Sequence, residues 1–277
     1  MPELPEVETT RKGIEPKVHQ QTITGFVIRD GRLRWPVEPH LKTNLPGLVV
    51  LSVLRRGKYI LLTTSKGVLL IHLGMSGNLR VLPIGTEVQK HDHIDIEFAN
   101  GYLLRLNDPR RFGSVLWHDA SLGPVEKHKL LAKLAPEPLT DAFNGAYFFE
   151  KIHKRRVAIK SLVMNSHVAV GAGNIYANEA LFMSKIHPQT PANALTLEQC
   201  NCLVENIKKV LLAAIEQGGT TLKDFLSPDG KPGYFVQQLN VYDQAGKHCP
   251  NCNHPIERMM LNQRATYFCA TCQPSAL

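Results

Sequence analysis

The segment His93-Ile94-Asp95-Ile96-Glu97-Phe98-Ala99-Asn100-Gly101-Tyr102-Leu103-Leu104-Arg105-Leu106-Asn107 decides the fold of the first half of the chain. Two runs rich in apolar residues, 93–98 and 102–107, flank Asn100-Gly101. This dipeptide is typical of the tight turn of a β-hairpin. The segment therefore predicts two antiparallel strands that are joined directly, with no helix between them.

The same pattern continues on both sides of this hairpin. Short runs, several of them β-branched or aromatic, are separated by turn signals such as Ser65-Lys66-Gly67. Successive strands without intervening helices favour an antiparallel sandwich or barrel. A helix over residues 3 to about 13 should precede them, because Ile14-Glu15-Pro16 is expected to end it. The predicted strands cover residues 22–29, 49–55, 58–64, 68–73, 93–98, 102–107 and 113–118.

The pattern changes at the proline-rich stretch Leu134-Ala135-Pro136-Glu137-Pro138, which we interpret as a linker. Apolar residues then recur at helical spacing, most clearly in the last of the predicted helices. A glycine-rich stretch, 218–246, follows and predicts a mobile loop. The predicted helices cover residues 141–154, 157–164, 175–184 and 197–217.

The composition is that of a globular protein: 43% of the 277 residues are hydrophobic and 20% are charged. A net charge of +8 makes an anionic partner plausible, although charge alone is weak evidence for nucleic-acid binding. No apolar run approaches the roughly 18 residues that span a bilayer. The start of the chain lacks the apolar core of a secretory signal, so we expect a cytoplasmic protein with no membrane partner.

Four of the six cysteines have the spacing of a zinc site. Cys249-x2-Cys252 and Cys269-x2-Cys272 are separated by sixteen residues, which is typical of four thiolates around one tetrahedral ion. Such a site has no open coordination position, so the predicted Zn²⁺ is structural. Arg264 should project from the hairpin between the two pairs. Cys200 and Cys202 lack ligand spacing; Cys200 is expected in a helical core.

The chain begins Met1-Pro2-Glu3-Leu4-Pro5-Glu6. Removal of Met1 would leave the secondary amine of Pro2 at the terminus, exposed and beside the carboxylate of Glu3. An α-amino group titrates near pH 8, so much of it is unprotonated at neutral pH and can form a Schiff base. The alternative is structural: the prolines introduce a helix, and the glutamates favour its positive end.

Four further segments decide between these interpretations: Arg56-Gly57-Lys58-Tyr59, His72-Leu73-Gly74-Met75-Ser76-Gly77, Asp108-Pro109-Arg110-Arg111-Phe112-Gly113 and Gly171-Ala172-Gly173-Asn174-Ile175-Tyr176-Ala177-Asn178-Glu179. Together with the N-terminus and the four cysteines, they closely resemble formamidopyrimidine-DNA glycosylase, the bacterial repair enzyme for oxidised purines. The resemblance extends from Pro2 to Gln273.

The resemblance implies a set of DNA-contacting residues. Met75, Arg110 and Phe112 would enter the space that an extruded base leaves, which suits a gap-filling thioether, a hydrogen-bonding guanidinium and an aromatic wedge. Residues of these motifs also have structural alternatives when each is considered alone. Lys58 could be an edge-strand lysine, His72 a core histidine, Asn174 a helix cap and Lys160 an exposed helical lysine. The other implied contacts are Lys58, His91, Lys160, Asn174, Tyr242 and Arg264.

The resemblance also implies the chemistry. The nitrogen of Pro2 would attack the sugar C1′ as the damaged base leaves, and the resulting imine would allow β- and then δ-elimination of the two phosphates. Glu3 would protonate the sugar, and Glu6 would hold Glu3 or carry a second proton. Lys58 would be a fourth catalytic residue. The loop 220–234 corresponds to a segment thought to close over oxidised guanine.

The implied fold is α+β in two domains: an N-terminal helix with an antiparallel β-sandwich, and a helical helix-two-turn-helix domain that carries the Cys₄ zinc finger. We place the boundaries at 1–134, 135–245 and 246–277 and expect a monomer on damaged double-stranded DNA. Two alternatives stay open. Endonuclease VIII shares the proline but removes oxidised pyrimidines, and a non-enzymatic zinc-ribbon protein would explain only the charge and the cysteines.

Overall fold

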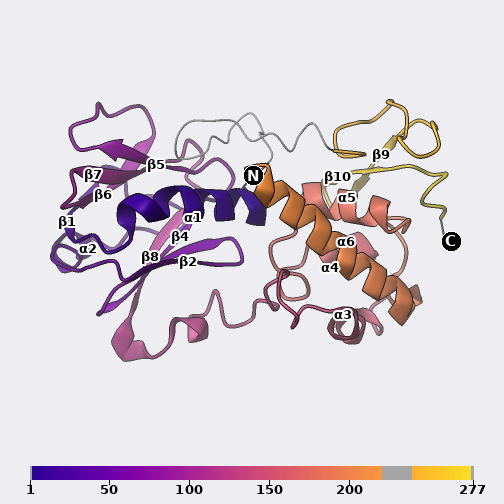
Figure 1. Cartoon of the computed structure of the whole chain (residues 1–277), viewed down its shortest axis with the longest axis horizontal. Coiled ribbons are helices and arrows are strands. Elements are labelled where there is room, and N and C mark those ends of the chain that lie inside the picture. The colour runs from indigo at the N-terminus through magenta and orange to yellow at the C-terminus, as the bar shows by residue number, and fades with distance from the viewer. Residues whose placement is uncertain (1, 220–238, 276–277) are drawn as a thin grey trace. The chain divides into compact units, whose positions relative to one another are not determined.

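The computed structural model describes residues 2–219 and 239–275, which form two compact units (Figure 1). The first contains residues 2–132 and 217–219, and the second contains residues 133–216 and 239–275. The loop predicted to close over the lesion, 220–234, lies outside the described residues. The three-part division at 134 and 245 stays a prediction. The sandwich, the helical domain and the cysteine cluster agree with the predicted α+β fold.

The first unit is an antiparallel β-sandwich preceded by a helix. One sheet has the order β1-β6-β7-β5 and the other β2-β3-β4-β8. Apolar side chains of both sheets and of the first helix share one buried core, in which Ile60, Leu104 and Ile14 are fully inaccessible. Its elements are α1 (Leu4–Val18), β1 (Ile23–Ile28), α2 (Leu41–Asn44), β2 (Ser52–Arg56), β3 (Tyr59–Thr63), β4 (Gly67–His72), β5 (Asn78–Pro83), β6 (Asp92–Phe98), β7 (Tyr102–Asn107) and β8 (Ser114–Asp119).

Three elements differ from those predicted, and one of them is the short helix α2, over residues that were not predicted to be helical. Helix α1 continues through Pro16 to Val18, because a proline this near the C-terminus interrupts only the last turn. Strand β5, Asn78–Pro83, was not predicted. It is an edge strand, where Pro83 is tolerated because its missing N–H is not needed by a further strand.

The register of the two sheets brings the predicted DNA-contacting loops to one end of the sandwich. In one sheet Tyr59 pairs with His72, which pairs with Ser114. In the other, Asn107 pairs with both Asn78 and Asp92. The turns and loops that begin or end at these two rows contain Lys58, Met75, His91, Arg110 and Phe112.

The second unit is helical, with a small two-stranded hairpin. Helix α6 buries one face, on which Cys200 is fully inaccessible; burial raises the pKa of this thiol to about 11. Cys202 lies off this face and is exposed. Nothing among the helices of residues 2–219 and 239–275 combines the length and apolar character of a membrane span. The elements are α3 (Gly145–Ile152), α4 (Ile159–Val163), α5 (Asn174–Met183), α6 (Leu197–Glu216), β9 (Glu257–Leu261) and β10 (Arg264–Phe268).

His72 ends β4 and is held as a neutral, hydrogen-bonded side chain. Its Nδ1 accepts a bond from the backbone N–H of Gly74 at 3.0 Å, and its ring packs on Tyr59 with centroids 4.8 Å apart. Burial lowers the pKa of His72 to about 4, and the positive charges of Lys58 and Arg34 act in the same direction.

This depressed pKa makes stability depend on pH. Between about pH 6.5 and pH 4 the unfolded chain takes up a proton that the folded His72 does not, so acid should destabilise the fold in this window. We expect His72→Asn, whose Oδ1 can still accept from Gly74, to lose about 2 kcal/mol less unfolding free energy than the wild type between pH 7.5 and pH 5. Urea unfolding at the two pH values measures this, and equal losses would contradict it.

Candidate functional site

The start of α1 holds two buried carboxylates next to Pro2. Glu3 is the N-cap of the helix, and its backbone N–H donates to Oε2 of Glu6 at 2.8 Å. Glu3 is 2% exposed and Glu6 1%. Pro2 is buried in the chain that carries Met1. The expectation of an exposed terminal amine concerns the chain after Met1 is removed, and it stays a prediction. The bond from Glu3 to Glu6 fixes the backbone directly after Pro2.

The loops at the end of the sandwich meet at Asp108, a fully buried carboxylate that sequence reasoning did not identify. Its Oδ1 accepts from the hydroxyl of Ser76 at 2.6 Å, and its Oδ2 accepts from the N–H of Gly113 at 2.8 Å. Its backbone N–H donates to the carbonyl of His91 at 3.0 Å. The position of an acidic residue directly after a strand and before Pro109 was the available signal, because such carboxylates often accept loop N–H groups.

The two loops that carry the predicted void-filling residues are in direct backbone contact. Gly74 has a φ of +64°, and a Cβ there would lie 2.4 Å from the carbonyl carbon of Phe112 and from the nitrogen of Gly113. Glycine is required by both its conformation and this contact. The structure therefore brings together the loop that carries Met75, which is half-buried, and the loop that carries Phe112, which is 50% exposed.

Arg110, Lys58 and His91 lie on the same end of this unit. Arg110 is exposed and its backbone N–H donates to the hydroxyl of Ser76 at 3.2 Å. Lys58 follows Gly57, which has a φ of +57°, in the turn between β2 and β3. His91 also has a positive φ, +73°, directly before β6. Lys58 and Arg110 add positive charge to a surface that also presents the aromatic ring of Phe112, a combination that suits contacts to DNA phosphates and bases.

In the second unit, Asn174 and Lys160 bind the same carbonyl oxygen. The Nδ2 of Asn174 donates to Ala265 at 2.9 Å, and the Nζ of Lys160 donates to Ala265 at 3.2 Å and to Thr266 at 2.6 Å. Lys160 is only 1% exposed, so the alternative of an exposed helical lysine is wrong. Asn174 does not cap α5: the N-cap is Gly173, and Asn174 is the first helical residue.

Tyr242 is positioned by Glu179, a buried carboxylate for which the sequence predicted no role. Glu179, on α5, accepts backbone N–H groups of Asn240, Val241 and Tyr242, each at 2.9 Å. The ring of Tyr242 packs edge-on against Tyr267 with centroids 5.2 Å apart. Glu179 thus ties α5 to the segment that precedes the cysteine hairpin.

Arg264 is exposed at the start of β10, directly after the tip of the hairpin. The tip residues Asn262 and Gln263 have φ values of +47° and +59°, the left-handed pair that a two-residue hairpin turn requires. The hairpin therefore projects Arg264 outward, as the sequence predicted, while Thr266 is buried.

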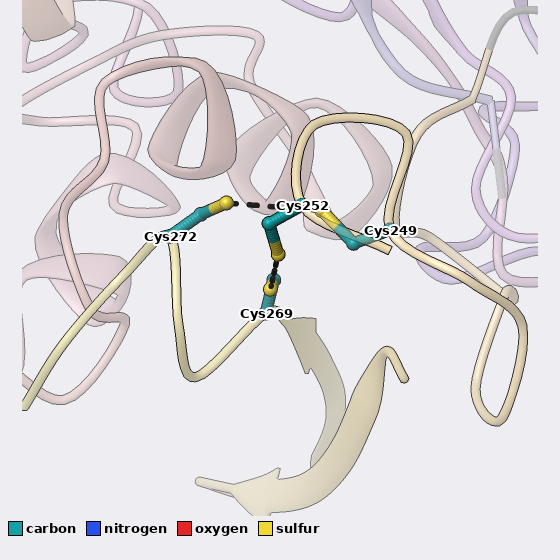
Figure 2. Close-up of side chains that lie close together, drawn as sticks. All are labelled: Cys249, Cys252, Cys269 and Cys272. Carbon is teal, nitrogen blue, oxygen red and sulfur yellow. Dashed lines mark hydrogen bonds between the residues drawn. The ribbon is translucent and has the colours of Figure 1, made fainter. Parts of the chain in front are cut away.

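The four predicted zinc ligands converge in space (Figure 2). Their sulfur atoms all lie within 4.8 Å of one another, with Cys249 and Cys272 at 3.8 Å and Cys252 and Cys269 at 3.4 Å. Tetrahedral Zn–S bonds of about 2.3 Å place sulfurs about 3.8 Å apart. The cluster fits one structural Zn²⁺ ion, which Cys249, Cys252, Cys269 and Cys272 would hold.

Family models match three parts of the chain. Residues 1–115 match the formamidopyrimidine-DNA glycosylase N-terminal domain, and residues 134–226 match the H2TH domain of the same family. Residues 246–274 match the zinc finger found in FPG and IleRS.

Whole proteins agree over the full length. A curated formamidopyrimidine-DNA glycosylase of Hydrogenovibrio crunogenus is 62% identical over 273 residues, which cover 99% of this chain and 96% of that protein. The crystal structure of MutM (Fpg) from Thermus thermophilus covers 100% of both chains with a TM-score of 0.88 and 38% identity. Lactococcus lactis Fpg in complex with abasic-site DNA covers 99% of this chain and 100% of its own, with a TM-score of 0.91 and 31% identity.

The motifs, the two-unit fold, the cysteine cluster and these likenesses agree with one another from the N-terminal helix to the zinc hairpin. The chain belongs to the formamidopyrimidine-DNA glycosylase family.

Proposed function

We propose that the nitrogen of Pro2 is the covalent nucleophile of this enzyme and that Glu3 and Glu6 serve it. As a member of its family the chain is a bifunctional DNA glycosylase and AP lyase of base excision repair, which removes oxidised purines from duplex DNA. The observation that carries the residue assignment is the buried pair at the start of α1, in which Glu6 accepts the N–H of Glu3 at 2.8 Å. This bond holds the residue next to the nucleophile.

The proposed reaction begins at the sugar. The lone pair of the Pro2 nitrogen forms a bond to C1′ as the bond from C1′ to the base breaks, and the base leaves with that electron pair and takes up a proton. The Pro2 nitrogen then gives up its own proton, and Glu3 protonates the sugar ring oxygen so that the bond from C1′ to this oxygen breaks and the ring opens to a protonated imine (iminium). The imine acidifies C2′, and loss of a C2′ proton expels the 3′ phosphate. A second elimination expels the 5′ phosphate. Glu6 carries a proton in these steps or only fixes Glu3.

DNA contacts in the proposal come from both units. An enzyme that acts on a damaged base must extrude it, at a cost of a few kcal/mol. Met75, Arg110 and Phe112 would occupy the vacated space, while Lys58, His91, Asn174, Tyr242 and Arg264 would hold phosphates. Lys160 is a weaker candidate for direct contact, because its ammonium group is buried against Ala265 and Thr266.

The substrate class is supported by relatives. Lactococcus lactis Fpg has been captured with DNA that contains Fapy-dG and with abasic-site DNA. We place this chain on the same kinds of lesion, as a monomer that the nucleoid DNA retains in the cytoplasm. The first alternative, a non-enzymatic zinc-ribbon protein, would not need the buried N-terminal carboxylates. The second alternative, endonuclease VIII, would be favoured if the protein excised thymine glycol in preference to oxoguanine.

Replacement of the N-terminal residues tests the chemistry. Pro2→Gly and Glu3→Gln should reduce oxoguanine excision by at least about a hundredfold, since each removes a group that takes part in bond making or proton transfer. Borohydride should trap the wild type on the DNA and not Pro2→Gly. Glu15→Gln, which changes a partly exposed carboxylate of the same helix, is the matched control. Excision by both variants at the wild-type rate would refute the assignment.

The void-filling residues are tested by a double substitution. Met75→Ala with Arg110→Ala should slow excision from duplex DNA by about tenfold or more, because an unfilled gap lets the base return to the stack. Arg32→Ala, a solvent-exposed arginine of the same unit, is the control. Single-turnover rates measure the effect, and rates equal to those of the control would remove both residues from the mechanism.

Metal removal tests the role of the zinc finger. Cys272→Ser should lower zinc content from one ion per chain and weaken DNA binding, because Arg264 and the Lys160 contact depend on the hairpin. Cys202→Ser, an exposed cysteine outside the cluster, should change neither. Atomic absorption and fluorescence anisotropy measure the two quantities. Full DNA affinity without bound zinc would contradict the proposed role.

A further inference from the structure

We propose that Ser76 is a positioning residue that couples Met75 to Arg110, so that the void-filling side chains act as one unit. The inference rests on the proposed function of these residues. Its basis is a single buried hydroxyl, 6% exposed, that lies between the two loops. Ser76 donates to Oδ1 of Asp108 at 2.6 Å and accepts from the backbone N–H of Arg110 at 3.2 Å.

The hydroxyl is matched to both neighbours. A serine side chain has one proton to donate and lone pairs to accept with, and here the proton goes to a carboxylate and a lone pair receives an amide. A carboxylate acceptor makes the first bond a strong, charge-assisted one. Bonds arranged in such a chain polarise and strengthen one another. The backbone of Arg110 is therefore held through Ser76 to Asp108.

Asp108 closes the other side of the same loop. Its second oxygen accepts the N–H of Gly113 at 2.8 Å, so that the residues at 110 and 113, on either side of Phe112, are bound to one Ser76–Asp108 pair. Met75 is joined covalently to Ser76. A shift of the hydroxyl would thus displace Met75 and the Arg110–Phe112 loop relative to each other.

Loss of this hydroxyl has a defined cost. Alanine at position 76 leaves one oxygen of a fully buried carboxylate and the N–H of Arg110 without their partner. The carboxylate of Asp108 is buried, and a buried group that loses its partner forfeits more than an average hydrogen bond. The loop is expected to relax so that both groups reach water, which moves Arg110 away from the position that the orphaned base would require.

Ser114 provides a matched control. It is also buried, at 1% exposure, and lies on the strand that follows the same loop. Its hydroxyl has no hydrogen-bond partner among the residues that the structure describes. Ser76→Ala and Ser114→Ala therefore remove the same atom from similar depth, but only the first removes a contact between the two loops.

The experiment compares two substrates under single-turnover conditions. Ser76→Ala should slow excision of oxoguanine from duplex DNA by about tenfold, the equivalent of one such hydrogen bond. It should leave cleavage at a preformed abasic site within about twofold, since there no base must be kept out of the stack. Ser114→Ala should match the wild type in each assay.

The outcomes separate this inference from the proposed function. If Met75→Ala with Arg110→Ala slows excision and Ser76→Ala does not, the coupling is refuted and the roles of Met75 and Arg110 stand. If the double variant has no effect, the proposed roles themselves fail. An equal loss on both substrates by Ser76→Ala, together with a lower thermal midpoint than that of Ser114→Ala, would show general structural damage and overturn the inference.

Discussion

A nucleophile at a chain terminus has no preceding residue to hold it, and the site depends on how this constraint is met. The backbone N–H that follows Pro2 is bound by the carboxylate of Glu6, one helical turn further on. Both glutamates are buried, so the bond is protected from competition with water. The first turn of α1 therefore holds the backbone next to the proposed nucleophile in place, and in the proposed mechanism the glutamates that start the helix also supply the acid chemistry.

The loops at the end of the sandwich must also be held in place, and Asp108 does this. Loops that carry recognition residues are normally the least ordered segments of a fold. Here one inaccessible carboxylate gathers Ser76 and Gly113, and its backbone binds His91, so that three loops share a single joint. Gly74 lies so close to the backbone of Phe112 and Gly113 that no side chain at position 74 would fit between the two loops. The loops that carry the proposed recognition residues are thus held together by hydrogen bonds at the strand ends.

The features that could be predicted from the sequence were those with local signals. The alternation around Asn100-Gly101, the cysteine spacing and the helical periodicity of α6 each depend on a few neighbouring residues. The residues proposed for catalysis and DNA contact come from the family resemblance. Tertiary effects could not be predicted in this way. The carboxylates of Glu179 and Asp108 accept hydrogen bonds from groups in other segments of the chain. Lys160 is buried because it binds a strand about a hundred residues later in the chain, and residues 78–83 form strand β5 because they pair with β7.

The central claim, that the secondary amine at the start of α1 makes the bond to deoxyribose, is tested most directly by locating that bond. The borohydride-reduced complex with abasic-site DNA can be digested with protease and nuclease and its peptides sequenced by mass spectrometry. The account predicts that the sugar remnant lies on an N-terminal peptide that begins with Pro2. A remnant on an internal lysine such as Lys58, or an active enzyme that retains Met1, would contradict it.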